Sequence, residues 1–565
     1  MIEYLKMSDA TILYANYFHE LMHLYPSMND YMQLSNYKKL GRRYENALSR
    51  RHILSTLEMV QRTRDALDAT GIKSHFDRVL RYDLDLAVEQ RAFPFHLMPM
   101  NHFENFIIRY MEMANGMGIF AFQTDADFKD FMSKTIQFAD VCYTSIENMK
   151  EGVVRGYTIP KCIAKLTIRQ LSEALRNESF KNSNVPDSLL VEWDTCIAEY
   201  LIRPTIAVLA YLGEYVTQCR HSIGVSALQD GARMYQFILK RETTVDGLTA
   251  DAIHRVGVRE VQRIRDQMHS VKHQFQFQGT FNEFSEHLRR RVDLRFRNEH
   301  EVMTAFRTYR DDQWNSLLDR HFDARPLRNY ELQRISPPQS DFAPGAYYTP
   351  GGIGSERPGT VFINNHNVTR MLKSDVEALS IHEGNPGHHD QLTLMNENQD
   401  IPMFVKMGSY AAYVEGWALY AERFGSYCNL PSYYGKLESE MLRAIRLVLD
   451  TGIHAYGWSF RRCRTYFRSN SGMHVDEIDA EISRYIANPG QAVSYKVGEL
   501  FISDMRRRFS GDDKTFHCMI LKNGSCPLSI LSQTLESEVG WERTEPSRKS
   551  QISKTLTTNR GAAAP

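Results

Sequence analysis

The sequence carries no excess of either charge. Its 565 residues include 68 Lys and Arg against 68 Asp and Glu, so the formal net charge at pH 7 is zero. Proteins that bind nucleic acids or anionic membranes usually show a basic surplus in their composition. The balance argues against a function based on bulk electrostatic attraction. We therefore expect neither a nucleic acid nor a membrane as a partner.

Long apolar runs and clustered cysteines are also missing. No stretch approaches the ~18 uninterrupted apolar residues of a membrane span, and residues 1–9 lack the apolar core of an export signal. The eight cysteines are widely spaced and form no CxxC pair, which is typical of free buried thiols in a reducing compartment. These features predict a cytoplasmic protein in which any metal ligands are histidines and carboxylates.

Most of the chain has the periodicity of helices, because apolar residues recur at three- and four-residue spacing. Between residues 326 and 372 proline and glycine concentrate instead. Within that stretch, residues 345–349 and 360–364 have the composition of strands, which is compatible with a small β-ribbon or with a surface loop.

The predicted fold is therefore mainly α-helical and is organised around this stretch. We expect four parts in the chain: a helical scaffold half (1–325), Pro/Gly-rich ribbon and loops (326–372), a second helical half that carries the chemistry (373–540), and a flexible tail (541–565).

The most informative motif is His382-Glu383, which follows a predicted helix start at Ser374. In the zinc motif HExxH a second histidine lies four residues after the first, but here that position is Pro386. The next histidines are His388 and His389. In an unbroken helix neither could reach the same ion as His382.

Pro386-Gly387 resolves this difficulty, because a proline and a glycine together predict a bend in the chain. Such a bend would bring one of the two following histidines back toward His382. The spacing alone leaves open whether that histidine is His388 or His389.

A second helix, predicted over residues 411–422, is apolar on nearly all sides yet carries Glu415 and, seven residues later, Glu422. Burying an unpaired carboxylate costs several kcal/mol, so a cationic partner is expected, and zinc fits this role. Glu415 is thus the candidate third ligand, and Glu422 is a candidate outer partner.

Two further segments carry polar groups in a regular pattern. The helix predicted over residues 437–454 has a polar stripe, which is more often a solvated face than a site; it consists of Arg443, Arg446, Asp450 and His454. After the turn at Pro489-Gly490, Tyr495 and Lys496 are candidate donors to a developing oxyanion.

Four segments together resemble the zinc metallopeptidase-like family catalogued as domain of unknown function 885, which is related to the gluzincins. The matching segments are HEGNPGHH (382–389), EGWALYAE (415–422), RLVLDTGIH (446–454) and PGQAVSYKVG (489–498). The resemblance extends over about residues 20–536. One departure is Asp390, where the family commonly has an apolar residue.

The resemblance implies two helical halves around a deep channel. It also implies one zinc ion on His382, His388 and Glu415, with Glu383 as the general base that acts on water. Tyr495 or His454 would stabilise the oxyanion. The other residues expected near the site, as outer contacts of the ligands or as substrate contacts, are His389, Gln391, Glu422, Arg446, Asp450, Gln491, Lys496, Tyr347 and Tyr348.

The predicted function is zinc-dependent hydrolysis of peptide bonds. Arg446 and Lys496 could bind a substrate carboxylate, and the ribbon around Tyr347 and Tyr348 could pair with an extended peptide. The expected partner is a peptide or a small amide. Two alternatives remain open, namely a zinc amidohydrolase acting on a non-peptide amide and a zinc-retaining peptide-binding protein without turnover.

Overall fold

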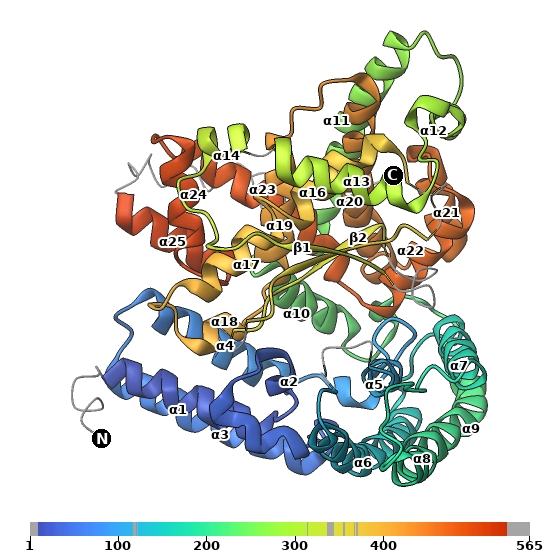
Figure 1. The fold of residues 1–565 in the computed structure, drawn as a ribbon, viewed down its shortest axis with the longest axis vertical. Coiled ribbons are helices and arrows are strands. Elements are labelled where there is room, and N and C mark those ends of the chain that lie inside the picture. Colours follow the sequence, from blue (N-terminus) through green and yellow to red (C-terminus); the bar gives the residue numbers. More distant parts are fainter. Residues whose placement is uncertain are drawn as a thin grey trace. The chain divides into compact units, whose positions relative to one another are not determined.

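A computed structural model describes residues 9–116, 120, 122–313, 315–335, 344–353, 356–366, 368 and 371–539. Helices dominate these residues (Figure 1), which confirms the predicted mainly α-helical fold. The predicted flexible tail, residues 541–565, lies outside the described residues.

Contacts divide the chain into two units. Unit 1 comprises residues 1–231 with residues 352–355 and 486–488, and unit 2 comprises the rest. The sequence-based boundaries at residues 325 and 372 both lie inside unit 2. The channel between two halves that the family resemblance implies stays a prediction.

Unit 1 is built from helices that pack as neighbours along the chain: α1 against α3, α3 against α4, and α9 against both α6 and α7. Its helices are α1 (Asp9–Leu24), α2 (Met28–Met32), α3 (Arg50–Thr70), α4 (His75–Gln90), α5 (Phe106–Ala114), α6 (Asp125–Arg155), α7 (Lys161–Arg176), α8 (Leu190–Ile197) and α9 (Arg203–Gln218).

One stretch of unit 1 meets the length and composition of a membrane span. Helices α8 and α9, joined through a π-helical turn at Ala198–Ile202, form the stretch Leu190–Gln218, whose most apolar window has a mean hydropathy of 1.3. Because α6 and α7 pack on α9, and because core helices of globular proteins meet the same criteria, this stretch is weak evidence for a membrane.

Unit 2 carries a small sheet and the longer list of helices. The helices are α10 (Gly231–Thr243), α11 (Ala250–Gln274), α12 (Phe281–Arg290), α13 (Glu299–Thr308), α14 (Asn315–His321), α16 (Val376–Glu383), α17 (His388–Glu397), α18 (Met403–Met407), α19 (Ala411–Ala421), α20 (Leu430–His454), α21 (Phe460–Asn470), α22 (Val475–Ala487), α23 (Gln491–Arg508), α24 (Asp513–Leu521) and α25 (Leu528–Val539).

The core of unit 2 lies around α20. Every residue of this helix from Ala444 to His454 is buried, as expected for a helix enclosed by others on all sides. Helix α11 packs closely against it, since a side chain at Gly257 would collide with Leu447 and Val448.

The predicted β-ribbon is present and has a third strand. Strands β2 (Ala346–Thr349) and β3 (Thr360–Ile363) pair antiparallel, and β1 (Glu331–Arg334) adds to β3 in parallel, giving the order β1-β3-β2. Tyr347 lies opposite Phe362, and their rings stack with centroids 4.9 Å apart. Strand β2 lies at an edge of this sheet, and it packs against α16.

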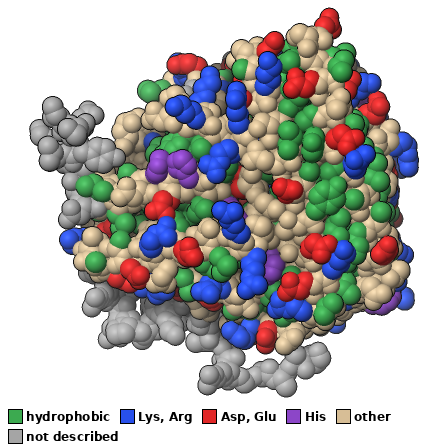
Figure 2. Space-filling model, turned by 90° about the horizontal axis from the view of Figure 1, so that it is seen from below, with side chains coloured by type: hydrophobic (Ala, Val, Ile, Leu, Met, Phe, Trp, Pro, Cys, Tyr) green, Lys and Arg blue, Asp and Glu red, His purple; other side chains and the backbone are tan. Residues whose placement is uncertain are grey.

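The cysteines agree with only part of the sequence interpretation. All eight cysteines are free, and five are buried, but Cys162, Cys428 and Cys518 are exposed, which corrects the expectation of buried thiols. Figure 2 shows Lys, Arg, Asp and Glu side chains intermixed on one face, without a broad field of either sign, in keeping with the zero net charge.

Candidate metal centre

Helix α16 carries His382 and Glu383 in its last turn, as the sequence predicted. The start of this helix differs from the predicted start at Ser374, where a bond from Glu377 back to Ser374 would cap it. The helix begins at Val376, and the Glu377 carboxylate accepts hydrogen bonds from the backbone N–H groups of Ser426 and Tyr427 instead of bonding back to Ser374. Glu377 therefore fastens the start of α16 to the segment that follows α19.

The predicted bend lies between α16 and α17. Helix α16 ends at Glu383, and α17 begins at His388. The indole Nε1 of Trp417 donates to the Pro386 carbonyl oxygen at 2.7 Å, which fixes the turn from the side of α19. At Gly387 a Cβ atom would lie 2.1 Å from the His382 carbonyl oxygen, so the turn needs glycine for lack of space.

The departure from the family pattern at Asp390 has a local structural role. The Asn385 side-chain amide donates to the Asp390 carboxylate across the same turn, and Asp390 is 1% exposed. Burial raises the pKa of Asp390 to about 7. Asp390 therefore helps to hold the turn that precedes the second histidine.

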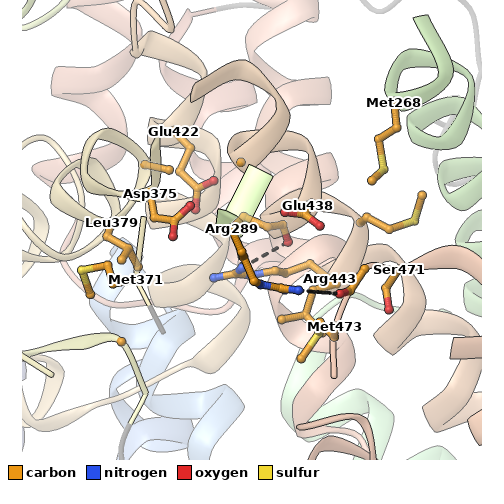
Figure 3. Close-up of a pocket in the computed structure, with 17 residues that line it drawn as sticks. Met268, Arg289, Met371, Asp375, Leu379, Glu422, Glu438, Arg443, Ser471 and Met473 are labelled. Carbon is orange, nitrogen blue, oxygen red and sulfur yellow. Dashed lines mark hydrogen bonds between the residues drawn. The ribbon is translucent and has the colours of Figure 1, made fainter. Parts of the chain in front are cut away.

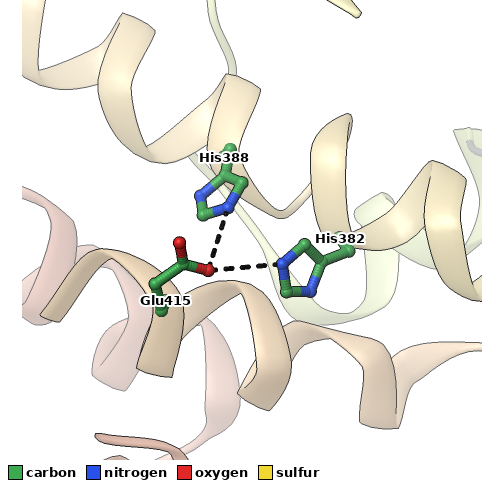
Figure 4. Close-up of side chains that lie close together, drawn as sticks. All are labelled: His382, His388 and Glu415. Atoms are coloured by element: carbon green, nitrogen blue, oxygen red, sulfur yellow. Dashed lines mark ion pairs between the residues drawn. The ribbon is translucent and has the colours of Figure 1, made fainter. Parts of the chain in front are cut away.

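The bend brings His382 and His388 together with Glu415 of α19 (Figure 4). The Nε2 atoms of the two histidines each lie 3.5 Å from the same carboxylate oxygen, Glu415 Oε2. Their rings are nearly perpendicular, with centroids 4.9 Å apart. The three ligand atoms all lie within 4.8 Å of one another.

This arrangement fits a tetrahedral metal ion. Bonds of about 2.1 Å to a tetrahedral zinc place two ligand atoms about 3.4 Å apart, close to the separations from Glu415 to both histidines. Two imidazoles and a carboxylate are also a ligand set that catalytic zinc sites use, with a fourth position free for water or substrate. The residues present therefore fit the metal that the family resemblance implies.

The third ligand depends on close packing of α19 against α23. A Cβ atom at Gly416 would lie 2.5 Å from the Cα of Gly498, so glycine at both positions lets the two helices approach. This contact explains the two glycines in the motifs EGWALYAE and PGQAVSYKVG. Although burial alone would raise the pKa of Glu415, hydrogen bonds from His382 and His388 lower it well below its usual range.

The two histidines have different supports. His382 Nδ1 lies 2.8 Å from Glu422 Oε1, and Glu422 is 2% exposed, so a buried carboxylate orients this ring as the sequence suggested. His388 Nδ1 is buried and has no hydrogen-bond partner among the described residues. The geometry of His388 is thus set by the turn and by Glu415 alone.

Glu383 lies beside the triad, the name used from here for His382, His388 and Glu415. It is 8% exposed, and its carboxylate makes no hydrogen bond or ion pair within the described part of the chain. Burial raises the pKa of Glu383 above its usual range, whereas the charges of His382, His388 and Arg443 lower it. A buried carboxylate without a partner is suited to exchange a proton with a neighbouring water.

His389 is directed away from the triad. Its Nε2 lies 3.0 Å from the Arg328 carbonyl oxygen, and its Nδ1 lies 3.1 Å from the Tyr348 hydroxyl. Burial lowers the pKa of this imidazole to about 4. Of the two histidines that the spacing left open, His388 is the one that lies with His382 and Glu415. Tyr348 contacts His389, not a ligand.

The cations expected to bind a substrate carboxylate are both paired inside the protein. Arg446 bonds to Glu481 at 3.1 Å and lies over the ring of Tyr495. Lys496 Nζ lies 2.9 Å from Glu440 and 2.8 Å from Glu499, and its side chain is 1% exposed. Neither charge is available to a ligand, which corrects their assignment as substrate contacts.

The candidate oxyanion donors and their neighbours have other partners. His454 is fully buried, with Nε2 2.9 Å from the Tyr485 carbonyl oxygen, and the Tyr495 hydroxyl accepts from Arg484. The remaining predicted residues also bond locally: Asp450 to the Tyr235 hydroxyl and the Gly490 N–H, Gln491 to Arg484, and Gln391 to the Tyr413 carbonyl oxygen. These bonds serve the fold around the triad.

One residue near the site was named in the polar stripe of α20 but was not expected to contact the site. Arg443 lies close enough for its charge to act on Glu383, and it forms no ion pair with any described residue. In the sequence, Arg443 was marked only by its place in the polar stripe, three residues before Arg446. The sequence could not show which of the two arginines finds a carboxylate within the fold.

The fold and site define a large, mainly α-helical protein with a candidate His-His-Glu metal centre. The chain matches the family described as bacterial protein of unknown function (DUF885) over residues 26–535, and it belongs to that family. No curated protein sequence matches it.

Two solved structures share the fold. A protein from Colwellia psychrerythraea, described as a putative lipoprotein, is 23% identical with a TM-score of 0.83, over 93% of this chain and 98% of that one. A protein from Shewanella oneidensis, described as a putative lipoprotein of unknown function, is 16% identical with a TM-score of 0.71, over 94% of this chain and 100% of that one.

These descriptions contradict the predicted cytoplasmic location. Both structural neighbours are described as lipoproteins, a class that is anchored to a membrane or exported. The expectation rested on the composition of the first residues and on the cysteines. Neither feature reports where a folded chain of this family resides.

Proposed function

We propose that this protein is a zinc-dependent hydrolase that cleaves peptide bonds. The observation that carries the proposal is the convergence of His382, His388 and Glu415 beside Glu383, a buried carboxylate that pairs with no described residue. A zinc ion bound there would polarise the scissile carbonyl and lower the pKa of a water molecule. A site for metal storage alone would not need Glu383 in this position.

Glu383 acts as the proton carrier in the proposed reaction. Its carboxylate takes a proton from the attacking water and then delivers it to the nitrogen of the leaving amine. Glu422 holds the His382 ring in a fixed orientation through its bond to Nδ1. The raised pKa of Glu383 favours this role, because a carboxyl that titrates nearer neutrality can both accept and release the proton.

Strand β2 supports a peptide as the substrate. It is an edge strand that packs on α16, the helix that carries His382 and Glu383. An edge strand can offer backbone donors and acceptors to an extended chain. Tyr347 and Tyr348 lie on this strand, so the ribbon predicted to pair with a peptide is next to the proposed chemistry.

A Glu383→Gln variant tests the proposal. It should keep the bound metal and lose about 100- to 10,000-fold in the rate of peptide hydrolysis, because the amide cannot take the proton. Hydrolysis is measured with a peptide library, and metal content by elemental analysis.

The outcome also separates the two alternatives. Cleavage of simple amides but of no peptide would indicate an amidohydrolase. Peptide binding without cleavage by the metal-loaded wild type would indicate a binding protein. Undiminished peptide cleavage by the Gln variant would remove Glu383 from the mechanism.

A further inference from the structure

A cavity of about 270 Å³ lies within unit 2 and shares Glu422, the hydrogen-bond partner of His382, with the metal centre. Figure 3 shows its lining, in which Arg289 and Arg443 stand between Asp375 and Leu379 on one side and Ser471 on the other in this view. The volume lies below the 300–1,000 Å³ typical of sites for drug-sized ligands. The space therefore suits one or two residues of a peptide and not a long chain.

Two residues connect this cavity to the metal centre. Glu422 lines it and also bonds to His382 Nδ1. Leu379 of α16 lines it as well. Because residues four apart on a helix lie on the same side, Glu383 lies on the side of α16 that faces the cavity, one turn beyond Leu379. A peptide group attacked beside Glu383 would have its next residue within reach of the cavity.

The two arginines in the lining lack carboxylate partners at normal hydrogen-bond distance. Arg443 bonds only within its own helix, to Ser439, and its Nε is buried without a partner among the described residues. Arg289 donates to the Gly472 carbonyl oxygen, and its nearest carboxylate, Glu286, is 3.9 Å away. A guanidinium presents planar pairs of N–H donors that match a carboxylate.

The acidic residues of the lining already have donors. Asp375 accepts from the Leu372 N–H and Glu438 from the Ser285 hydroxyl, and burial raises the pKa of Glu438 to about 7. Glu422 accepts from His382 with Oε1, while its Oε2 has no hydrogen-bond partner among the described residues. Ser471 Oγ is also buried and unpartnered. The lining groups without a described hydrogen-bond partner are thus two donors, Arg443 Nε and Ser471 Oγ, and one acceptor, Glu422 Oε2.

We infer that this cavity binds a carboxylate group of the peptide substrate, held by Arg443 and Arg289, just beyond the bond that is cleaved. The last residue of a peptide offers a carboxylate together with an amide N–H, which matches the arginines and the free oxygen of Glu422. An acidic side chain offers the same carboxylate. The inference rests on the proposed function and narrows its substrates to peptides with a negative charge at that position.

Three versions of one short peptide test the inference: a free C-terminal carboxylate, a C-terminal amide, and the amide with Glu as its last residue. Cleavage is measured as kcat/KM with the metal-loaded wild type. Binding of the fluorescently labelled peptides to Glu383→Gln is measured by anisotropy, which reports recognition without turnover. Arg443→Met and Arg443→Lys are compared with Arg290→Met, a neighbour of Arg289 whose side chain is 79% exposed.

The wild type should prefer a carboxylate-bearing peptide over the neutral amide at least tenfold in both measurements. Arg443→Met should abolish this preference, Arg443→Lys should retain part of it, and Arg290→Met should leave it unchanged. Preference for the free terminus alone, or for the Glu side chain alone, supports the inference and identifies which carboxylate is bound.

Equal cleavage of all three peptides by the wild type would overturn the inference and leave the proposed peptidase function intact. A preference that survives in Arg443→Met would overturn it as well. Failure of the wild type to cleave or bind any peptide would instead remove both. Thermal unfolding of each variant shows whether it is folded. If Arg443→Met does not fold, the inference is decided by Arg443→Lys and by the wild-type comparison of the carboxylate-bearing and amidated peptides.

Discussion

Unit 2 contains two clusters of titratable side chains, mostly buried or half-buried, in which the charges are paired in opposite ways. The paired cluster, Glu260, Arg263, Glu440, Lys496 and Glu499, joins every cation to at least one carboxylate. The metal-site cluster, His382, Glu383, His388, Glu415 and Arg443, leaves Glu383 and Arg443 without an ion-pair partner in the described chain. Unpaired buried charge is costly and is kept where a ligand completes it.

This difference separates charged residues that stabilise the fold from charged residues that can bind a ligand. The polar positions on α20 and α23 are ambiguous in sequence, because Arg443, Arg446 and Lys496 are all cationic side chains on helices near the site. Their partners separate them: Arg446 and Lys496 are neutralised inside the protein, and Arg443 is not. Mutations should therefore affect stability in the paired cluster and ligand binding in the metal-site cluster.

The largest effect on stability is expected for Lys496→Met. Removing this ammonium deprives Glu499 of its cation and leaves Glu440 and Glu260 with Arg263 as their shared partner, so the variant should lose about 3 kcal/mol in the free energy of unfolding. Arg443→Met, which breaks no ion pair, should lose less than about 1 kcal/mol. Urea and thermal denaturation of both variants make the comparison. A larger loss for Arg443→Met would reverse the distinction between the clusters.

A smaller effect, on metal affinity, is expected for Glu422→Ala. It removes the carboxylate that orients His382, and loss of such an outer partner typically weakens metal binding about 10- to 100-fold. Glu422→Gln keeps an acceptor for His382 Nδ1 and should lose less. Competition with a chelator measures the affinity. Unchanged affinity in the Ala variant would mean that Glu422 serves only the fold.

The smallest effect is a pH dependence from Asp450, a third kind of buried charge. Burial raises the pKa of Asp450 from 3.8 to about 7, while hydrogen bonds from Tyr235 and Gly490 lower it. The folded chain then binds more protons than the unfolded chain between these values. The contribution of Asp450 to stability is fully present below pH 3.8 and is lost as the pH rises through about 7.

Asp450→Asn should remove this dependence, because the Asn Oδ1 can still accept from Tyr235. Between pH 5 and pH 8 the wild type should lose roughly 2 kcal/mol more in the free energy of unfolding than the variant. Denaturation curves at the two pH values give the difference, in which the other titrating groups cancel. Parallel behaviour of the two proteins would show that Asp450 ionises normally.

Much of the site was predictable because its parts are local in sequence. The His382-Glu383 pair, the bend at Pro386-Gly387 and the buried Glu415 each follow from helix geometry or from the cost of burying charge. The choice of His388 over His389 was not predictable, since it depends on α17 beginning at His388. The resemblance to the family supplied that choice before the structure did.

The errors share a different physical origin. Arg446 pairs with Glu481, and Lys496 pairs with Glu260 in addition to its helix neighbour Glu499. Glu481 and Glu260 lie far away in sequence, so local periodicity does not predict these two pairs. Strand β1 is polar, with Glu331 and Arg334 at its ends, and it forms only because β3 offers it an edge. Both the ion pairs and strand β1 depend on residues distant in sequence, which local periodicity does not reveal.

The most direct test of the account is the metal content of three purified proteins: the wild type, His388→Ala and His389→Ala. The wild type should hold one zinc ion per chain, His388→Ala should lose it, and His389→Ala should retain it, because only His388 lies with His382 and Glu415. A wild type without a tightly bound divalent ion, or zinc retained in His388→Ala and lost in His389→Ala, would contradict the proposed centre.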